Sequence, residues 1–264
     1  MVASLAIGPS LELFHLELLR NLRQRPGRFE YALKGGTNLR FFHGSIRYSQ
    51  DADMDIITGS LDDVQREVAR ALGATALRKT LAAHDIAILE HALSKQTETT
   101  QRWKFRLQVQ LSTREGTRLP VPTRIEFSAR EELLDYLGES RDDFVAAEVV
   151  QPHQVIAPLV RHYPAAPAIV QKIRSLAERQ QVQSRDVFDL ELLFRKNPAS
   201  LVAGRVDETK VRQAVDRASD ITFEDYQTQV VAFLEEAYVE QYDDPRQWEH
   251  IQISVIEGLQ GLLQ

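Results

Sequence analysis

The 264-residue sequence contains no cysteine, which excludes disulfide bonds, a thiolate nucleophile and a cysteine-ligated zinc site. It has no run of about 18 apolar residues, the length that a membrane-spanning helix requires. The first ten residues show neither the basic start nor the long apolar stretch of a secretion signal. From these absences we expect a cytoplasmic protein with no membrane partner.

Positive charge is also in short supply, since the formal net charge is −6. This balance argues against a protein coated in positive charge for bulk binding of nucleic acid, but it is compatible with a local basic groove. Hydrophobic residues make up 43% of the chain, so it can bury a sizeable core, as one large domain or two modest ones.

The first part of the chain has the pattern of an α/β domain. Tyr31 to Lys34 is apolar and stops at two glycines, as expected of a strand that runs into a tight turn. Alternating polar and apolar residues predict further strands, with turn signals between the last two that favour an antiparallel portion. The expected strands are 31–34, 51–58, 87–90, 103–111 and 123–128, and the expected helices are 11–22, 37–42 and 61–72. We therefore expect a mixed sheet in a domain over residues 1–155.

The pattern changes near Pro152. Pro158, Pro164 and Pro167 predict an irregular connection, after which apolar residues follow helical spacing. The expected helices are 168–180, 184–195, 208–218, 226–238 and 247–263. The sequence therefore predicts an α+β protein whose C-terminal domain, residues 156–264, is helical.

Three aspartates, Asp51, Asp53 and Asp55, alternate on one predicted strand and should share one face. Two such charges about 4 Å apart repel by roughly 4 kcal/mol at an effective dielectric constant near 20, so a cation is expected to neutralise them. Mg²⁺ suits this role because it binds one or two carboxylates together with substrate phosphates. An exposed acidic strand is the alternative. A calcium-binding EF-hand loop is disfavoured, because Ile56 and Asp62 stand where that loop needs Gly and Glu.

A glycine turn precedes these acids. Gly35-Gly36-Thr37 joins a predicted strand to a helix that Thr37 is expected to cap. Glycines let a phosphate approach the backbone, and a helix N-terminus offers free N–H groups. A lone Gly-Gly-Thr is more often only a turn, but a turn of this kind shortly before paired carboxylates fits a triphosphate with its metal.

The two segments together resemble a known family. Residues 33–40 read LKGGTNLR and residues 47–53 read RYSQDAD, and both resemble the AbiEii/AbiGii-type nucleotidyltransferases. These are toxin-like members of the DNA polymerase β superfamily, linked to type IV toxin–antitoxin and phage-abortive systems. The resemblance implies a polymerase β-like nucleotidyltransferase domain in which Asp51 and Asp53 bind Mg²⁺. It also implies nucleotide-binding roles for Gly35, Gly36, Thr37, Arg47 and Ser49. Asp55 is then an additional acid without a role, although an Asp53/Asp55 pair is the alternative register.

The strand Thr123 to Ser128 supplies a third acid, Glu126. Two-metal phosphoryl chemistry usually requires such a group to position the attacking hydroxyl or to accept its proton. The family resemblance extends to this strand, so we assign Glu126 to the metal and catalytic site. The alternative is a half-exposed glutamate paired with Arg124 or Arg130.

The resemblance continues in the C-terminal domain, where residues 171–179 read QKIRSLAER and residues 184–190 read SRDVFDL. Lys172 and Arg179 are seven residues apart and share a helix face, from which Lys172 is expected to contact the triphosphate. A solvated basic face is the alternative. Arg179, Arg185, Asp186 and Asp189 are expected to support Lys172. Asp186 also fits the first turn of a helix capped by Ser184, and Asp189 fits a pair with Arg185.

Three more cations alternate with aromatic residues on one strand. Arg102, Lys104 and Arg106 lie on the face opposite Trp103 and Phe105. This basic face fits a track for an RNA end, and a solvated sheet surface fits it equally well.

These features predict attack by an acceptor hydroxyl on the α-phosphate of an NTP. The resemblance makes a tRNA 3′ end the leading acceptor and implies a toxin with a possible cognate antitoxin. Two alternatives stay open. One is nucleotidylation of a protein or small molecule, and the other is a catalytically silent regulatory module of the same fold.

Overall fold

The computed structural model describes residues 2–22, 24–110, 117–129 and 138–263, with side chains from residue 7 onward. The chain forms two compact units. Unit 1 comprises Met1–Phe42 and Tyr48–Tyr163, and unit 2 comprises His43–Arg47 and Pro164–Gln264. No helix in the described part of the chain is long and apolar enough to cross a membrane.

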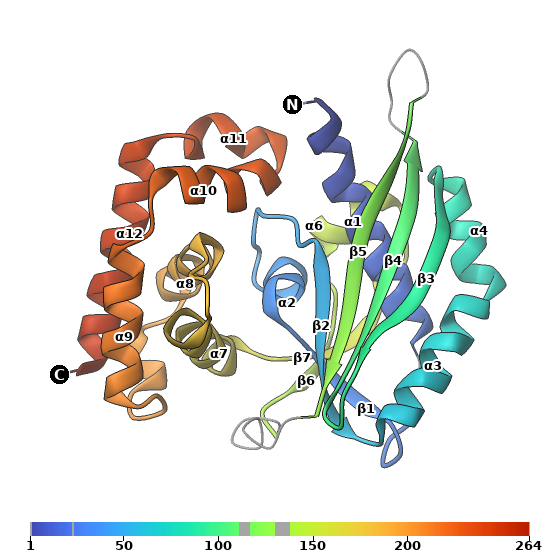
Figure 1. Ribbon diagram of the computed structural model, residues 1–264, viewed down its shortest axis with the longest axis horizontal. Coiled ribbons are helices and arrows are strands. Elements are labelled where there is room, and N and C mark those ends of the chain that lie inside the picture. Colours follow the sequence, from blue (N-terminus) through green and yellow to red (C-terminus); the bar gives the residue numbers. More distant parts are fainter. Residues whose placement is uncertain (1, 23, 111–116, 130–137, 264) are drawn as a thin grey trace. The chain divides into compact units, whose positions relative to one another are not determined.

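Unit 1 is built on a mixed sheet whose strands run in the order β3-β4-β5-β2-β1-β7-β6 (Figure 1). The strands β2 and β5 pair in parallel, as do β1 and β7, and the other neighbours are antiparallel. The bounds are β1 Glu30–Lys34, β2 Asp51–Thr58, β3 Ile86–Gln96, β4 Thr100–Gln110, β5 Arg118–Ser128, β6 Arg141–Phe144 and β7 Leu159–His162. The predicted mixed sheet and the α+β class are therefore confirmed.

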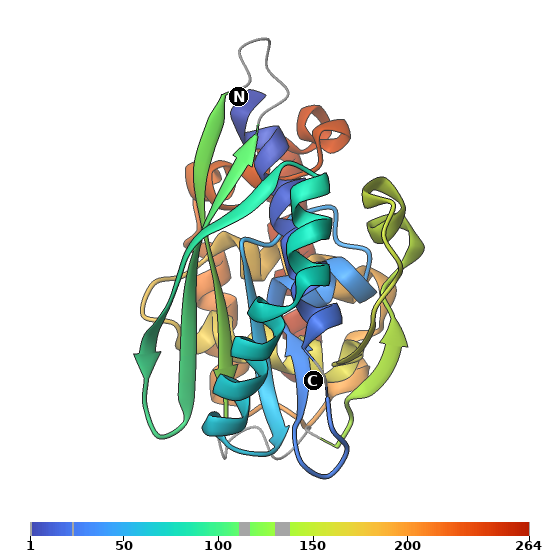
Figure 2. The ribbon, with the colours of Figure 1, turned by 90° about the vertical axis from the view of Figure 1, so that its right-hand side faces the viewer.

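Helices cover one face of this sheet, and α3 and α4 lie against β3 and β4 (Figure 2). Strand β4 points Trp103, Phe105 and Leu107 into the core, where the Phe105 ring lies 5.1 Å from that of Phe14. Lys104 and Arg106 point to the opposite, exposed face. The helices of unit 1 are α1 Val2–Asn21, α2 Gly35–Phe42, α3 Leu61–Gly73, α4 Thr75–Ala83 and α6 Ala147–Val150, followed by the 3₁₀ turn Gln151–His153.

Unit 2 is helical, as predicted. Its core includes Tyr226 stacked on Trp248 with ring centroids 4.6 Å apart. The segment His43–Arg47 belongs to this unit because Arg47 pairs with Leu234 in an antiparallel bridge and the carbonyl of Ile46 accepts a bond from Glu235. The helices are α7 Ala165–Glu178, α8 Ser184–Lys196, α9 Glu208–Ser219, α10 Phe223–Gln229, α11 Glu236–Tyr242 and α12 Pro245–Gln260, with 3₁₀ turns at Ala199–Val202, Val231–Phe233 and Gly261–Leu263.

The structure differs from the sequence-based expectation in several places. The expected irregular connection contains β7, which lies in the sheet of unit 1, so the units divide at 163/164 and not at 155/156. The single helix expected over 226–238 is broken, because the backbone at Leu234 and Glu235 turns aside to pair with the segment 46–47. Helix α4 and strand β6 were not expected, since each is short and has weak periodicity.

Candidate functional site

The turn between β1 and α2 brings the backbone close to Asp53. Gly35 is the first residue of α2 and has φ +69°, a left-handed conformation that favours glycine. A Cβ at this position would lie 3.3 Å from Oδ2 of Asp53. Both the backbone angle and the close approach therefore require glycine beside the aspartate.

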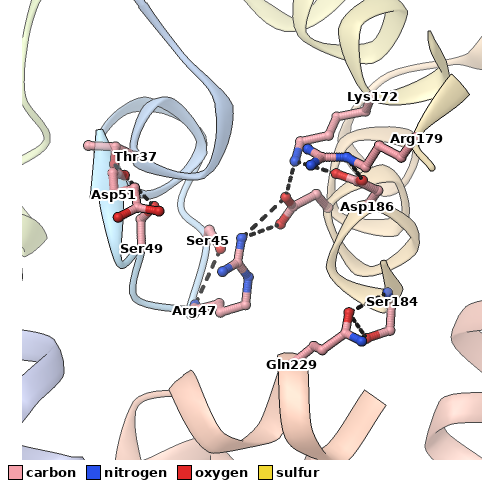
Figure 3. Close-up of polar contacts among 11 residues, drawn as sticks. Thr37, Ser45, Arg47, Ser49, Asp51, Lys172, Arg179, Ser184, Asp186 and Gln229 are labelled. Carbon is pink, nitrogen blue, oxygen red and sulfur yellow. Dashed lines mark hydrogen bonds and ion pairs between the residues drawn. The ribbon is translucent and has the colours of Figure 1, made fainter. Parts of the chain in front are cut away.

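Two hydroxyls hold the main chain of Asp51 (Figure 3). The hydroxyl of Thr37 donates to the Asp51 carbonyl at 2.7 Å, and the hydroxyl of Ser49 donates to the same oxygen at 2.9 Å. Thr37 is buried in the first turn of α2, which starts at Gly35, so it does not cap the helix as expected. Its side chain instead ties the glycine turn to the start of the acidic strand.

Strand register gathers the three candidate acids. In the parallel pair of β2 and β5, Asp53 lies opposite Glu126 and Asp51 lies opposite Arg124. Neighbouring strands are about 4.8 Å apart, so Asp51, Asp53 and Glu126 occupy adjacent positions on one face. The structure thus brings together the residues of unit 1 that the sequence nominated for the metal.

Arginines neutralise two of these acids. The guanidinium of Arg124 donates from Nε to Asp51 at 3.0 Å, and its backbone N–H donates to the other carboxylate oxygen at 3.0 Å. The hydrogen bond to Asp51 is the main cause of a raised pKa for Arg124. Glu126 accepts a 2.6 Å bond from Arg102, a partner that the sequence did not suggest. Of the two arginines that it did suggest, Arg130 lies outside the described residues.

Asp55 has a different environment. Its side chain is fully buried, contacts the ammonium group of Lys34 and accepts a 3.0 Å bond from the hydroxyl of Tyr163. These contacts join β2 to β1 and to the end of β7. They favour a structural role for Asp55 and, with it, the Asp51/Asp53 register of the acidic pair.

The donor set fits a hard cation that also binds substrate. Within the residues that the structure describes, no three His, Cys, Asp or Glu side chains lie close enough to hold a metal by themselves. Mg²⁺ usually takes only one or two carboxylates and completes its shell with water and phosphate oxygens. Asp51 and Asp53 would supply such a pair. Glu126 lies next to it, but the three acids do not form the three-carboxylate metal set that we expected from the sequence.

Unit 2 contains a buried cluster around Lys172 (Figure 3). The ammonium group of Lys172 lies 2.9 Å from Asp186 and 2.5 Å from Asp189, and both carboxylates are fully buried. Arg179 approaches the second oxygen of Asp186 at 2.8 Å. The acids expected to support Lys172 therefore contact it directly.

Arg47 belongs to the same cluster. Its Nη2 lies 3.3 Å from each oxygen of Asp189. Burial by itself raises the pKa of Asp189, but Lys172 and Arg47 outweigh it and hold that pKa below its ordinary value. Arg185 lies in the field of this group, and burial lowers its pKa. The cluster thus contains four cations, Lys172, Arg47, Arg179 and Arg185, and two carboxylates.

Two local expectations for α8 are wrong. Ser184 is the first residue of the helix and does not cap it, because its hydroxyl donates to the carbonyl of Asp225 at 2.9 Å. Asp189 pairs with Lys172 and Arg47 and not with Arg185. In both cases a contact distant in sequence replaces the local one.

Two contacts at this site were not expected from the sequence. Arg124 binds the side chain of Asp51, and His15 reaches the same strand end through Thr123. The Thr123 hydroxyl donates to the carbonyl of Gln50 at 2.7 Å. His15 is 108 residues from Thr123 in sequence, so no local pattern pointed to this contact.

A mixed sheet that places paired aspartates beside a glycine turn defines the class of this protein as a nucleotidyltransferase. The family model described as nucleotidyl transferase AbiEii toxin, type IV toxin–antitoxin system, matches residues 17–260, so the chain belongs to that family. No curated protein sequence matches it.

Solved structures share the fold over nearly the whole chain. A putative nucleotidyltransferase from Helicobacter pylori is 19% identical with a TM-score of 0.58, covering 95% of this chain and 92% of its own. JHP933 from the same organism is 19% identical with a TM-score of 0.56, covering 97% and 91%. MenT4, a nucleotidyltransferase toxin from Mycobacterium tuberculosis H37Rv, is 17% identical with a TM-score of 0.51, covering 96% and 94%.

Proposed function

We propose that this nucleotidyltransferase transfers NMP from an NTP to an acceptor hydroxyl with the help of Mg²⁺ held by Asp51 and Asp53. The observation that supports the proposal is the approach of the Asp53 carboxylate to the Gly35 turn, where the first backbone N–H groups of α2 are suited to phosphate. When bound, Mg²⁺ supplies neutralisation of the charge that develops on the phosphates.

Different residues of the site are proposed to act on the acceptor, the metal and the triphosphate. The acceptor oxygen forms a bond to the α-phosphorus, and the bond from that phosphorus to the β-phosphate oxygen breaks. Pyrophosphate leaves with the electron pair, and Glu126 takes the proton of the acceptor hydroxyl. Gly35, Gly36 and Thr37 present the first backbone N–H groups of α2 to the triphosphate, and the hydroxyl of Ser49 keeps Asp51 in place.

We propose that the Lys172 cluster attracts and binds the negatively charged triphosphate of the NTP. Four cations face two carboxylates there, so the cluster retains positive charge after its internal pairs are formed. Asp186 and Asp189 hold Lys172 in one orientation, which reduces the entropy lost when it binds a phosphate. Arg47, Arg179 and Arg185 add to the attraction for an anion.

For the acceptor we propose the 3′ end of tRNA. The family resemblance supports this choice and a role in phage defence, and the family description supports action as a toxin with a cognate antitoxin. Transfer to a protein or a small molecule is the competing function.

Labelled nucleotides distinguish these acceptors. Purified protein is incubated with α-labelled NTPs, Mg²⁺ and total tRNA, either intact or oxidised with periodate to destroy the 3′-terminal diol. We expect label in intact tRNA, none in oxidised tRNA and none without Mg²⁺. Label in protein, or equal label in both tRNA samples, would contradict a 3′-terminal acceptor.

A growth assay tests the toxin role. Expression of the wild-type chain should arrest growth, and Asp53→Ala should relieve the arrest at equal protein level. A harmless wild type that still transfers NMP in vitro would separate the enzymatic function from toxicity.

A further inference from the structure

The exposed face of β3, β4 and β5 carries most of the positive charge of the sheet. On β4, Lys104 and Arg106 are exposed and alternate with buried residues. Their cross-strand neighbours extend the same face onto β3 and β5. The cations of this face are Lys95, Arg102, Lys104, Arg106, Arg118 and Arg124, and its acids are Glu90 and Glu126. This basic face stands out on a chain with a net charge of −6.

The basic face begins at the candidate active site. Asp51 lies opposite Arg124 in the ladder of β2 and β5, and Arg124 lies opposite Lys104 in the ladder of β5 and β4. With about 4.8 Å between strands, one row of side chains runs from the acidic pair straight onto the cations. Arg124 stands at the junction and binds Asp51.

A cavity of about 550 Å³ follows this row. Its lining includes Gln50 and Asp51, Pro122 and Arg124 on β5, Lys104 and Arg106 on β4, and the acid Glu90 on β3. The described part of unit 1 thus offers a hollow that Asp51 shares with the exposed cations of β4, although Asp53 and Glu126 are not among its lining residues.

The layout of the charges indicates the kind of ligand. The cations do not converge on one point, as they would around a single phosphate, but are spread over three strands. A row of separated cations matches the repeated charge of a polynucleotide backbone. The positive charge of this face suits an RNA strand and an acidic protein alike. An RNA strand has, in addition, a terminal hydroxyl that could reach Asp51, which lines the cavity.

We propose that the basic face, including Lys104 and Arg106, binds the phosphates of the acceptor RNA next to its 3′ end and guides that end to Asp51. This inference rests on the proposed transfer to an RNA terminus. It goes further by assigning the acceptor path to the exposed sheet face of unit 1.

The test compares two neutralising double variants. Lys104→Gln/Arg106→Gln removes two cations from the basic face. Arg66→Gln/Lys79→Gln removes two exposed cations from α3 and α4, which cover the opposite face of the sheet. Both proteins have the same net charge, and circular dichroism and urea unfolding establish that each is folded.

Binding of a 5′-labelled 12-nucleotide single-stranded RNA is measured without NTP at several salt concentrations. Each phosphate contact contributes about 0.7 to the salt slope, which corresponds to roughly 5-fold in affinity at about 0.1 M salt. We therefore expect the basic-face variant to bind about 25-fold more weakly, with a slope smaller by about 1.4. The control variant should bind close to the wild-type level.

Equal RNA binding by the basic-face variant and the control would overturn the inference. A second result would also overturn it. If the wild type binds poly-glutamate as tightly as RNA, and the basic-face variant loses both ligands, the face suits an acidic protein. Transfer of α-label to RNA is scored separately on the same samples. If the basic-face variant binds RNA as the control does and transfers NMP at the normal rate, the proposed function holds but the RNA does not follow the basic face. Selective loss of RNA binding in a protein that never labels RNA supports the path and contradicts the function.

Discussion

Nε2 of His15 lies 2.9 Å from the hydroxyl oxygen of Thr123, and both side chains are buried. Because the Thr123 hydroxyl donates its proton to the carbonyl of Gln50, its oxygen accepts from the histidine, which assigns the proton of the neutral ring to Nε2. The chain of bonds ends at the peptide group that leads into Asp51. On its other side, Asp51 has its own carbonyl held by Thr37 and Ser49.

From these hydrogen bonds we predict that Thr123 positions Asp51. Replacement by Val keeps the shape but removes both hydrogen bonds. If Asp51 holds Mg²⁺ as proposed, we expect kcat to fall about 10-fold, the usual effect of losing a residue that orients a metal ligand. KM for NTP should stay unchanged, and Thr123→Ser should restore kcat. A loss of stability without a change in kcat would indicate that the bonds serve folding alone.

The burial of His15 leads to a prediction of how the free energy of unfolding depends on pH. Burial lowers its pKa from 6.5 to about 4, although the charges of Asp51 and Glu12 act in the opposite direction. The unfolded chain therefore takes up this proton first, and stability falls as the pH drops from about 6.5 to 4, by at most about 3 kcal/mol from this residue. Urea unfolding at pH 7 and pH 4.5 measures the loss. His15→Gln should show a shallower pH dependence, and an unchanged slope would contradict the assignment of a neutral, buried histidine.

Lys172 should matter for both stability and activity. Lys172→Met leaves Asp186 and Asp189 buried with one cation fewer, and we expect a loss of about 3 kcal/mol in the free energy of unfolding. Adding Asp189→Asn should recover part of this stability because it removes one of the stranded charges. Activity should stay low in the double variant if Lys172 contacts the triphosphate. Recovery of activity together with stability would limit Lys172 to a structural role.

Asp55 and Asp53 should behave in opposite ways. Asp55→Asn weakens the contact with Lys34 and leaves that lysine without its buried carboxylate, so we expect the free energy of unfolding to fall by about 2 kcal/mol. Asp53→Asn lies at a half-buried position and should change the stability little. Thermal unfolding of the two variants tests this contrast, and a larger loss for Asp53 would contradict the division between structural and reactive acids.

Local patterns in the sequence were enough for the central part of the fold. Strand β2 and helix α3 matched their expected residues closely, because one alternates cleanly and the other starts with a Ser60 capping box. Strand β7 was missed because it is only four residues long and lies between Pro158 and Pro164. The break between α10 and α11 was missed because its cause, pairing with residues 46–47, is distant in sequence.

The same limit applies to the site. Spacing placed Asp51 and Asp53 on one face, and the family resemblance pointed to Glu126 and Lys172. The partners of these residues were not visible in the sequence, because Arg102, Arg124 and His15 reach them only through strand pairing and packing. The structural environment of Asp55 was equally invisible, because its partners Lys34 and Tyr163 are distant in sequence.

The most direct test of the central claim is the rate of NMP transfer by Asp53→Asn. Wild type and variant are compared with α-labelled NTP, Mg²⁺ and tRNA at equal folded fraction, established by urea unfolding. We predict that the variant loses at least about 100-fold in transfer while it stays folded, because the Mg²⁺ that Asp53 is proposed to hold would stabilise the charge of the transition state. Transfer at the wild-type rate by the folded variant would contradict the assignment of Asp53 to the reaction centre.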